Sequence, residues 1–132
     1  MIPKMLVVED EPNLQFFFKD MFEEYFKEIK IAGSANEARE IMKTFIPEII
    51  LLDLKMGPFE DRSGLELLRE LRGKGSKVQV VVASAVDDPE DIDEAYKLGI
   101  RNYLKKPFNM DRLRDEVYKY LREIGRDIVP HE

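Results

Sequence analysis

Five short runs of apolar and β-branched residues recur along the chain, separated by stretches with helical periodicity. The runs cover residues 5–8, 29–32, 49–52, 78–83 and 100–104. Each run predicts a β-strand, and the lack of a polar face indicates strands that are buried on both sides. Strict alternation of such strands with helices predicts an α/β fold, a doubly wound five-stranded parallel sheet with helices on both faces. The run at 49–52 is the most uniformly apolar, so we expect it at the centre of the sheet.

A helix start signal follows each of these runs. The expected start residues are Pro12, Ser34, Ser63, Asp88 and Asn109, and the last helix should end by Gly125. Ser34 and Ser63 are each followed three residues later by a glutamate, which is the spacing of a capping box. Asp88 precedes a proline, and this pair suits an N-cap and the first helical position.

The helix that starts at Pro12 has an apolar face and one aromatic residue outside it. At about 100° per residue, six apolar side chains fall within an arc of roughly 140° and form the expected core face. They are Leu14, Phe17, Phe18, Met21, Phe22 and Tyr25. Phe16 points about 200° away from Leu14, so we expect it to be exposed to solvent.

The composition excludes several classes of protein. With 132 residues and a formal charge of −6, the chain is expected to form one domain, residues 1–132. We expect no nucleic-acid partner, because binding to the phosphate backbone needs clustered Lys and Arg. The chain has no cysteine, which excludes disulfides and thiolate metal sites. Its apolar runs are too short for a signal peptide or a membrane span, so we expect a soluble cytoplasmic protein without a membrane partner.

Polar residues stand at the carboxyl ends of four of the predicted strands. The first run is followed by Glu9, Asp10 and Glu11, the third by Asp53, the fourth by Ser84, and the fifth by Lys105 and Lys106. In an open parallel sheet, ligands bind beyond the carboxyl ends of the strands. We therefore expect carboxylates, a hydroxyl and an ammonium group to meet at one edge of the sheet.

This combination of groups suits phosphoryl chemistry with a divalent cation. Clustered carboxylates repel one another unless a cation lies among them, and Mg²⁺ prefers oxygen ligands. Asp10 and Asp53 would be direct ligands, with Glu9 acting mainly through water. Asp53 is also placed to attack a phosphoryl group and form an aspartyl phosphate, whose oxygens Lys106 and Ser84 would stabilise.

Four motifs together resemble the receiver domain of two-component response regulators. They are VVEDEP with Glu9 and Asp10, LLDLKM with Asp53, VVVASA with Ser84, and NYLKKPF with Lys106, and the likeness covers roughly residues 4–125. The resemblance implies the strand order 2-1-3-4-5 and a cis bond between Lys106 and Pro107. It also implies that the Lys55 backbone carbonyl completes the Mg²⁺ shell, and that Tyr103 is a rotamer switch reporting on Ser84.

The resemblance also implies partners. A histidine kinase or a phosphotransfer protein would supply the phosphoryl group, and we hypothesise that Phe16 is a docking anchor for it. Only seven residues follow Gly125, so we expect a single-domain response regulator whose switch is read by an unidentified protein. That protein would bind the face formed by the fourth helix, the fifth strand and the fifth helix. The chain would signal by binding and would not be an enzyme, apart from Mg²⁺-dependent self-phosphorylation and autodephosphorylation.

The segment after Asp53 departs from the family pattern. Gly64 comes eleven positions after Asp53, so the loop from Gly57 to Arg62 is about three residues longer than usual. We hypothesise that its last four residues shape the access of a kinase or a phosphatase to the site. They are Phe59, Glu60, Asp61 and Arg62. The alternative is a tolerated surface insertion, because lengthening a loop costs little free energy.

Other interpretations stay open. A receiver-like interaction module would have kept the fold and lost phosphorylation. A phosphatase of haloacid dehalogenase type places a second Asp two residues after its nucleophile, where this chain has Lys55. A flavodoxin-like electron carrier would bind a phosphate where this chain is acidic. Among single residues, Glu9 and Asp10 could instead favour a helix dipole, and Tyr103 could simply pack at the sheet edge.

Overall fold

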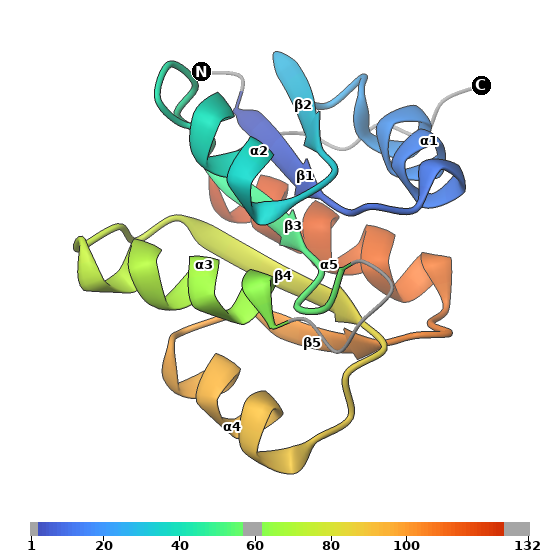
Figure 1. Cartoon of the computed structure of the whole chain (residues 1–132). Helices are drawn as coiled ribbons and strands as arrows, with labels where there is room; N and C mark the ends of the chain where they lie inside the picture. The colour runs from blue at the N-terminus through green and yellow to red at the C-terminus, as the bar shows by residue number, and fades with distance from the viewer. Residues whose placement is uncertain (1–2, 57–61, 126–132) are drawn as a thin grey trace.

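The computed structural model describes residues 3–56 and 62–125, which form a three-layer α/β fold (Figure 1). The elements are β1 Lys4–Val8, α1 Pro12–Phe22, β2 Glu28–Ala32, α2 Ala35–Ile41, β3 Ile49–Leu52, α3 Ser63–Gly73, β4 Gln79–Ser84, α4 Pro89–Lys97, β5 Asn102–Lys105 and α5 Met110–Glu123. Every strand pair is parallel, and the strand order is β2-β1-β3-β4-β5. The predicted fold class, the strand order and the central position of β3 are confirmed.

The strands begin and end within two residues of the predicted runs. The largest difference is at β5, which starts at Asn102 and not at residue 100. Gly99 has a φ of 79° and ends α4 in the left-handed conformation that glycine adopts readily. The two residues after Gly99 lead the chain from this turn back to the sheet, so the strand begins later than its apolar pattern does.

The predicted helices start where they were expected, but one of the predicted caps is wrong. The side chains of Ser34, Asp88 and Asn109 each accept a hydrogen bond from a backbone N–H in the first turn of α2, α4 and α5, respectively. Ser63 does not cap α3: the N-cap is Arg62, and Ser63 is the first helical residue. A capping serine needs an extended backbone, whereas Ser63 already has helical geometry.

Two apolar cores lie on the two faces of the sheet. Because side chains alternate along a strand, neighbouring residues of β1 and β3 point into different cores. Leu6 and Ile50 belong to the core covered by α2, α3 and α4, whereas Met5 and Ile49 belong to the core covered by α1 and α5. Figure 1 shows α5 behind the sheet and α2 and α3 in front of it. Among the described helices, none is long and apolar enough to cross a membrane.

Helix α1 differs from the prediction at one position. Phe18 and Phe22 are buried, and Phe16 is 66% exposed, as predicted. Phe17, which was expected in the core, is 52% exposed. The buried arc is centred on Phe18, and Phe17 lies about 100° away from it, outside the arc. The rings of Phe16 and Phe17 instead pack edge to face, with their centroids 5.9 Å apart.

Candidate functional site

The carboxyl ends of the strands meet at one edge of the sheet, and the residues beyond them are still held by backbone hydrogen bonds. The Asp53 N–H donates to the Val8 carbonyl at 3.0 Å, and the Lys106 N–H donates to the Ser84 carbonyl at 2.8 Å. The backbone of both Asp53 and Lys106 is therefore fixed by the neighbouring strand. Their side chains start from defined positions.

A lysine ammonium group joins two buried carboxylates at this edge. Lys106 Nζ donates to Glu9 Oε1 at 2.7 Å and to Asp53 Oδ2 at 3.0 Å. Glu9 is 2% exposed and Asp53 is 4% exposed. The other oxygen of Asp53, Oδ1, accepts the backbone N–H of Lys55 at 3.0 Å. The structure thus brings three of the predicted site residues into one cluster of charge-assisted hydrogen bonds.

Burial and mutual charge shift the pKa values in this cluster. Burial raises the pKa of Glu9, and the neighbouring Asp53 charge raises it further against the opposing hydrogen bond from Lys106. Burial alone would lower the pKa of Lys106, but its hydrogen bond to Glu9 and the charge of Asp53 outweigh burial and raise it. Lys106 therefore carries its positive charge at neutral pH.

The acidic side chains also form a set of possible cation ligands. Glu9, Asp10 and Asp53 each offer a carboxylate oxygen, and these oxygens lie within 4.8 Å of one another. Asp10 is exposed, whereas the other two are buried. Mg²⁺ takes one or two carboxylates and keeps several waters, so a site with oxygen donors and one side open to solvent suits it. The residues present fit a magnesium ion.

Two further residues help to position the site, and the sequence gives no clear sign of this role for either of them. Gln15 Nε2 donates to the Glu9 carbonyl at 2.6 Å and so ties α1 to the end of β1. A Cβ at Gly64 would lie 2.1 Å from the Asp53 carbonyl oxygen and 2.7 Å from Leu54 Cα. Only glycine fits there without a backbone shift. The sequence identifies Gly64 as a residue near a helix start, but it does not show that α3 begins directly against Asp53.

Ser84 and Tyr103 meet at one residue beside the cluster. The Ser84 hydroxyl is fully buried and accepts the Val86 N–H at 3.3 Å. The Tyr103 hydroxyl donates to the Val86 carbonyl at 2.5 Å. Burial raises the pKa of Tyr103 to about 12, so its hydroxyl stays a hydrogen-bond donor at neutral pH. The ring of Tyr103 packs against the core under α2, α3 and α4.

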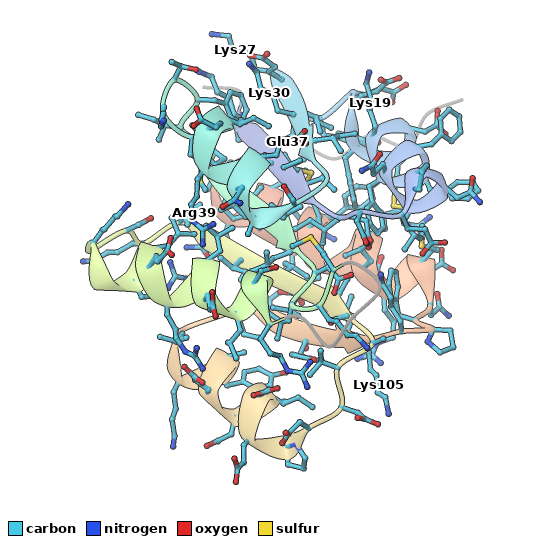
Figure 2. All side chains as sticks on the ribbon, viewed as in Figure 1. Lys19, Lys27, Lys30, Glu37, Arg39 and Lys105 are labelled. Atoms are coloured by element: carbon cyan, nitrogen blue, oxygen red, sulfur yellow. The ribbon has the colours of Figure 1, made fainter. Side chains whose placement is uncertain are left out.

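The other predicted residues lie further from the acidic cluster or outside the described chain. Lys105 is exposed, with its Nζ 3.4 Å from Asp87 Oδ2, and Figure 2 shows its side chain at the outer surface near the end of β5. Lys106, and not Lys105, therefore reaches the carboxylates. The predicted cis bond between Lys106 and Pro107 is present. The loop residues 57–61 lie outside the described residues.

An open pocket of about 480 Å³ adjoins the lysine of the cluster. It lies between the start of α1, the end of β4 and the start of α5. Its lining residues are Glu11, Leu14, Ala85, Lys106, Pro107, Phe108 and Met110. A partner bound in this pocket would lie beside the Lys106 side chain.

A parallel sheet of order 2-1-3-4-5, with an acidic cluster and a lysine at its carboxyl edge, defines a class of flavodoxin-like α/β signalling domains. Comparison with known families makes the assignment specific, because the model of the response regulator receiver domain matches residues 5–118. The chain belongs to the receiver domain family of response regulators. Receiver domains are generally non-enzymatic signalling modules that interact with histidine kinases or phosphotransfer proteins, and they typically bind Mg²⁺.

Individual relatives agree with this family. The chain is 34% identical over 120 residues to the probable C4-dicarboxylate response regulator DctR of Bacillus subtilis, a match covering 89% of this chain and 51% of DctR. It is 27% identical to sporulation initiation phosphotransferase F of the same organism, over 89% of this chain and 93% of that protein. The receiver domain of a Francisella response regulator has a similar structure, with a TM-score of 0.77, 31% identity, and coverage of 93% and 99%. The chain thus spans about half the length of DctR.

Proposed function

We propose that Asp53 accepts a phosphoryl group from a histidine kinase or a phosphotransfer protein, with Mg²⁺ bound at the neighbouring carboxylates. The observation that carries this proposal is the Lys106 ammonium group, held 3.0 Å from the buried Asp53 carboxylate. A fixed cation beside a carboxylate nucleophile can balance the negative charge of an incoming phosphoryl group. Membership in the receiver family supports the same function.

Asp53 would be the nucleophile of the transfer. One of its oxygens forms a bond to phosphorus while the bond from phosphorus to the donor breaks, and the donor leaves with the electron pair. Lys106 would balance the charge on the phosphoryl oxygens, and the Ser84 hydroxyl would donate to one of them. The buried position of Asp53 restricts the direction from which a donor can approach.

The magnesium ligands would come from the ends of two strands, β1 and β3. Asp10 and Asp53 would bind the ion directly, together with the Lys55 backbone carbonyl, and Glu9 would act through a water molecule. When bound, Mg²⁺ would supply additional charge stabilisation at the phosphoryl oxygens. The short reach between Lys55 N–H and Asp53 Oδ1 supports this ligand set, since it brings the backbone of residue 55 beside the carboxylate.

Ser84 and Tyr103 would report phosphorylation to the face formed by α4, β5 and α5. A hydrogen bond from Ser84 to the phosphoryl group would draw its hydroxyl towards Asp53. Tyr103 would respond because both side chains contact Val86. Phosphorylation would therefore shift a two-state equilibrium at this face, where a downstream protein binds.

Intact-mass measurement after incubation with Mg²⁺ and acetyl phosphate tests the proposal. We expect one added phosphoryl mass on the wild type, and none on Asp53→Asn or after removal of Mg²⁺. Lys106→Ala should lower the rate of uptake by about 100-fold, because a preorganised charge beside the phosphoryl group is lost. Lys105→Ala is the matched control, because the exposed Lys105 side chain pairs with Asp87 and not with Glu9 or Asp53. A phosphoryl mass that persists on Asp53→Asn would contradict the proposal.

Phe16 is the proposed docking anchor for the kinase. It lies exposed on α1 beside Phe17, and the start of α1 lines the pocket next to Lys106. Exposed aromatic residues often dominate the energy of an interface. Phe16→Ala should slow phosphotransfer from the cognate kinase and leave uptake from acetyl phosphate unchanged. Equal transfer rates from the kinase would reject the anchor.

Several expectations stay predictions. The charge of −6 argues against direct contact of this chain with nucleic acid. The relatives include a transcriptional regulatory protein, CitB of Klebsiella pneumoniae, which is 32% identical and half covered by the match. The single-domain organisation, the cytoplasmic location and the effect of the lengthened loop on access to Asp53 also stay predictions. For the loop, deleting three residues within 57–62 and measuring phosphoryl uptake and decay is the direct test.

A further inference from the structure

Helix α4 buries little apolar surface and is attached to α3 by arginines. Of the residues in Pro89–Lys97, all of which the structure describes, only Ala95 is fully buried. Three arginines contact α4 or the turn that ends it: Arg62 contacts Asp91, Arg69 contacts Glu94, and Arg72 contacts the carbonyls of Leu98 and Gly99. These polar contacts therefore do much to set the position of α4.

The contact made by Arg62 is shielded more from solvent than the one made by Arg69. Arg62 Nε lies 2.7 Å from Asp91 Oδ2, and the two side chains are 32% and 18% exposed. Arg69 and Glu94 form a two-point ion pair whose side chains are 48% and 35% exposed. Because solvent screens exposed ion pairs strongly, the Arg62–Asp91 pair should restrain α4 more.

Arg62 also lies close in the chain to a residue that packs against the backbone of Asp53, the proposed phosphoryl acceptor. It is the N-cap of α3, two residues before Gly64, whose Cα lies against the Asp53 carbonyl. The Gly64 N–H donates to the Leu54 carbonyl at 3.2 Å. A backbone shift at Asp53 would therefore reach Arg62 through direct packing.

The charges of the same ion pair act on the hydroxyl group of Tyr103. Burial is the main cause of the raised pKa of Tyr103. Among the smaller causes, the charge of Asp91 raises this pKa and the charge of Arg62 lowers it. The Tyr103 hydroxyl donates to the carbonyl of Val86, two residues before Asp88, which is the N-cap of α4. Arg62 therefore contacts the first turn of α4, and Tyr103 contacts the segment that leads into this turn.

We propose that Arg62 is a positioning residue whose ion pair with Asp91 couples the state of Asp53 to the position of α4. The inference rests on the proposed phosphorylation of Asp53 and names a residue that transmits it. Without the ion pair, Asp53 would still accept a phosphoryl group, but α4 would move more freely and would respond less to the modification. Arg69 would not have this role, because it lies two helical turns further along α3.

Hydrogen exchange of the full chain, measured by mass spectrometry with Mg²⁺ and with or without acetyl phosphate, tests this inference. We expect Arg62→Gln to gain phosphoryl mass from acetyl phosphate as the wild type does, because this small donor needs no docking of a kinase at the loop. Before phosphorylation, its α4 peptide should exchange about three- to fivefold faster, and the change on phosphorylation should fall below about half of the wild-type change. Arg69→Gln, the matched control, should alter α4 exchange by less than about twofold and keep the wild-type response.

A double-mutant cycle separates coupling from a general loss of structure. Asp91→Asn should reproduce the effect of Arg62→Gln, and the double variant should show no further effect, because both changes remove one interaction. Three results would overturn the inference. Arg62→Gln and Arg69→Gln could behave equally, or the effects of Arg62→Gln and Asp91→Asn could add in the double variant. The third result is a wild-type α4 peptide that does not respond to phosphorylation. Absence of phosphoryl mass on the wild type is the separate result that would overturn the proposed function, and the inference with it.

Discussion

Helices α4 and α5 lie on either side of the edge strand β5, and they are held there in different ways. Helix α5 buries four side chains, those of Leu113, Val117, Tyr120 and Leu121. Helix α4 fully buries only Ala95. Apolar burial acts over a whole face and does not depend on any single charge, whereas an attachment by ion pairs changes when one partner moves. Helix α5 therefore anchors β5, whereas a shift of α4 to a second position should cost less free energy than a shift of α5.

Arg101 contacts α5 and Arg72 contacts the end of α4, but these two arginines have different roles. Arg101 lies 3.2 Å from Glu116 of α5 and also pairs with Glu123, and in both cases it adds to a packed interface. Arg72 donates to the carbonyl of Leu98 at 2.6 Å, where the last turn of α4 leaves carbonyls without helical partners. Arg72 therefore replaces helical hydrogen bonds at the end of α4, whereas Arg101 supplements the apolar packing of α5.

The largest expected effect comes from removing apolar burial under α5. Leu121 is fully buried, so Leu121→Ala should lower the free energy of unfolding by about 2–5 kcal/mol. The matched change in α4 is Ala95→Gly, which should cost only about 1 kcal/mol because little packing is lost. Urea denaturation at neutral pH measures both. Similar losses for the two variants would contradict the difference between the helices.

An effect of intermediate size is expected when Arg72 and Arg101 are each replaced by methionine. Arg72→Met keeps the aliphatic part of the side chain and leaves the Leu98 carbonyl without its donor, which should cost about 1–3 kcal/mol. The loss should appear as faster hydrogen exchange in α4. Arg101→Met should leave exchange in α5 nearly unchanged, because Leu113, Val117 and Leu121 still pack against the sheet. Faster exchange in α5 than in α4 would reverse the comparison.

Much of this architecture could be predicted from the sequence, because strands that are apolar on both faces fit few folds. The prediction for β3, Ile49–Leu52, matches the structure at both ends. The pattern does not say which strands pair, so their order depended on the resemblance to a family. The proximity of Glu9, Asp53 and Lys106 could be predicted because parallel strands bring their carboxyl ends to one edge. Their chemical roles stay proposals.

The predictions that failed, and the contacts that were missed, depend on neighbours that the sequence does not show. Phe17 and Ser63 have suitable residue types, but the width of a buried arc depends on the packed surface, and capping depends on backbone conformation. Arg62 and Asp91 are 29 residues apart, and no local pattern pairs them. Gly64 is required by the Asp53 backbone, which comes close to it only in the folded chain.

The smallest expected effect is an acid response that separates the two helices. Hydrogen bonds from arginine lower the pKa of Glu94 in α4 and of Glu123 in α5 below the ordinary value of 4.5. A carboxylate with a lowered pKa contributes stability above its unfolded pKa and loses it as the pH falls through the folded value. Both contacts should therefore weaken as the pH falls below about 4.5.

Only α4 should loosen in this acid range, because α5 keeps its apolar packing when its ion pairs are lost. Hydrogen exchange corrected for the intrinsic effect of pH, compared between pH 6 and pH 3.5, measures the response of each helix. Arg69→Gln is the control, because removing the partner of Glu94 should abolish part of the acid response of α4 and leave α5 unaffected. Equal loosening of both helices in acid would mean that ion pairs matter as much for α5 as for α4, and the distinction between an anchored and an adjustable helix would fail.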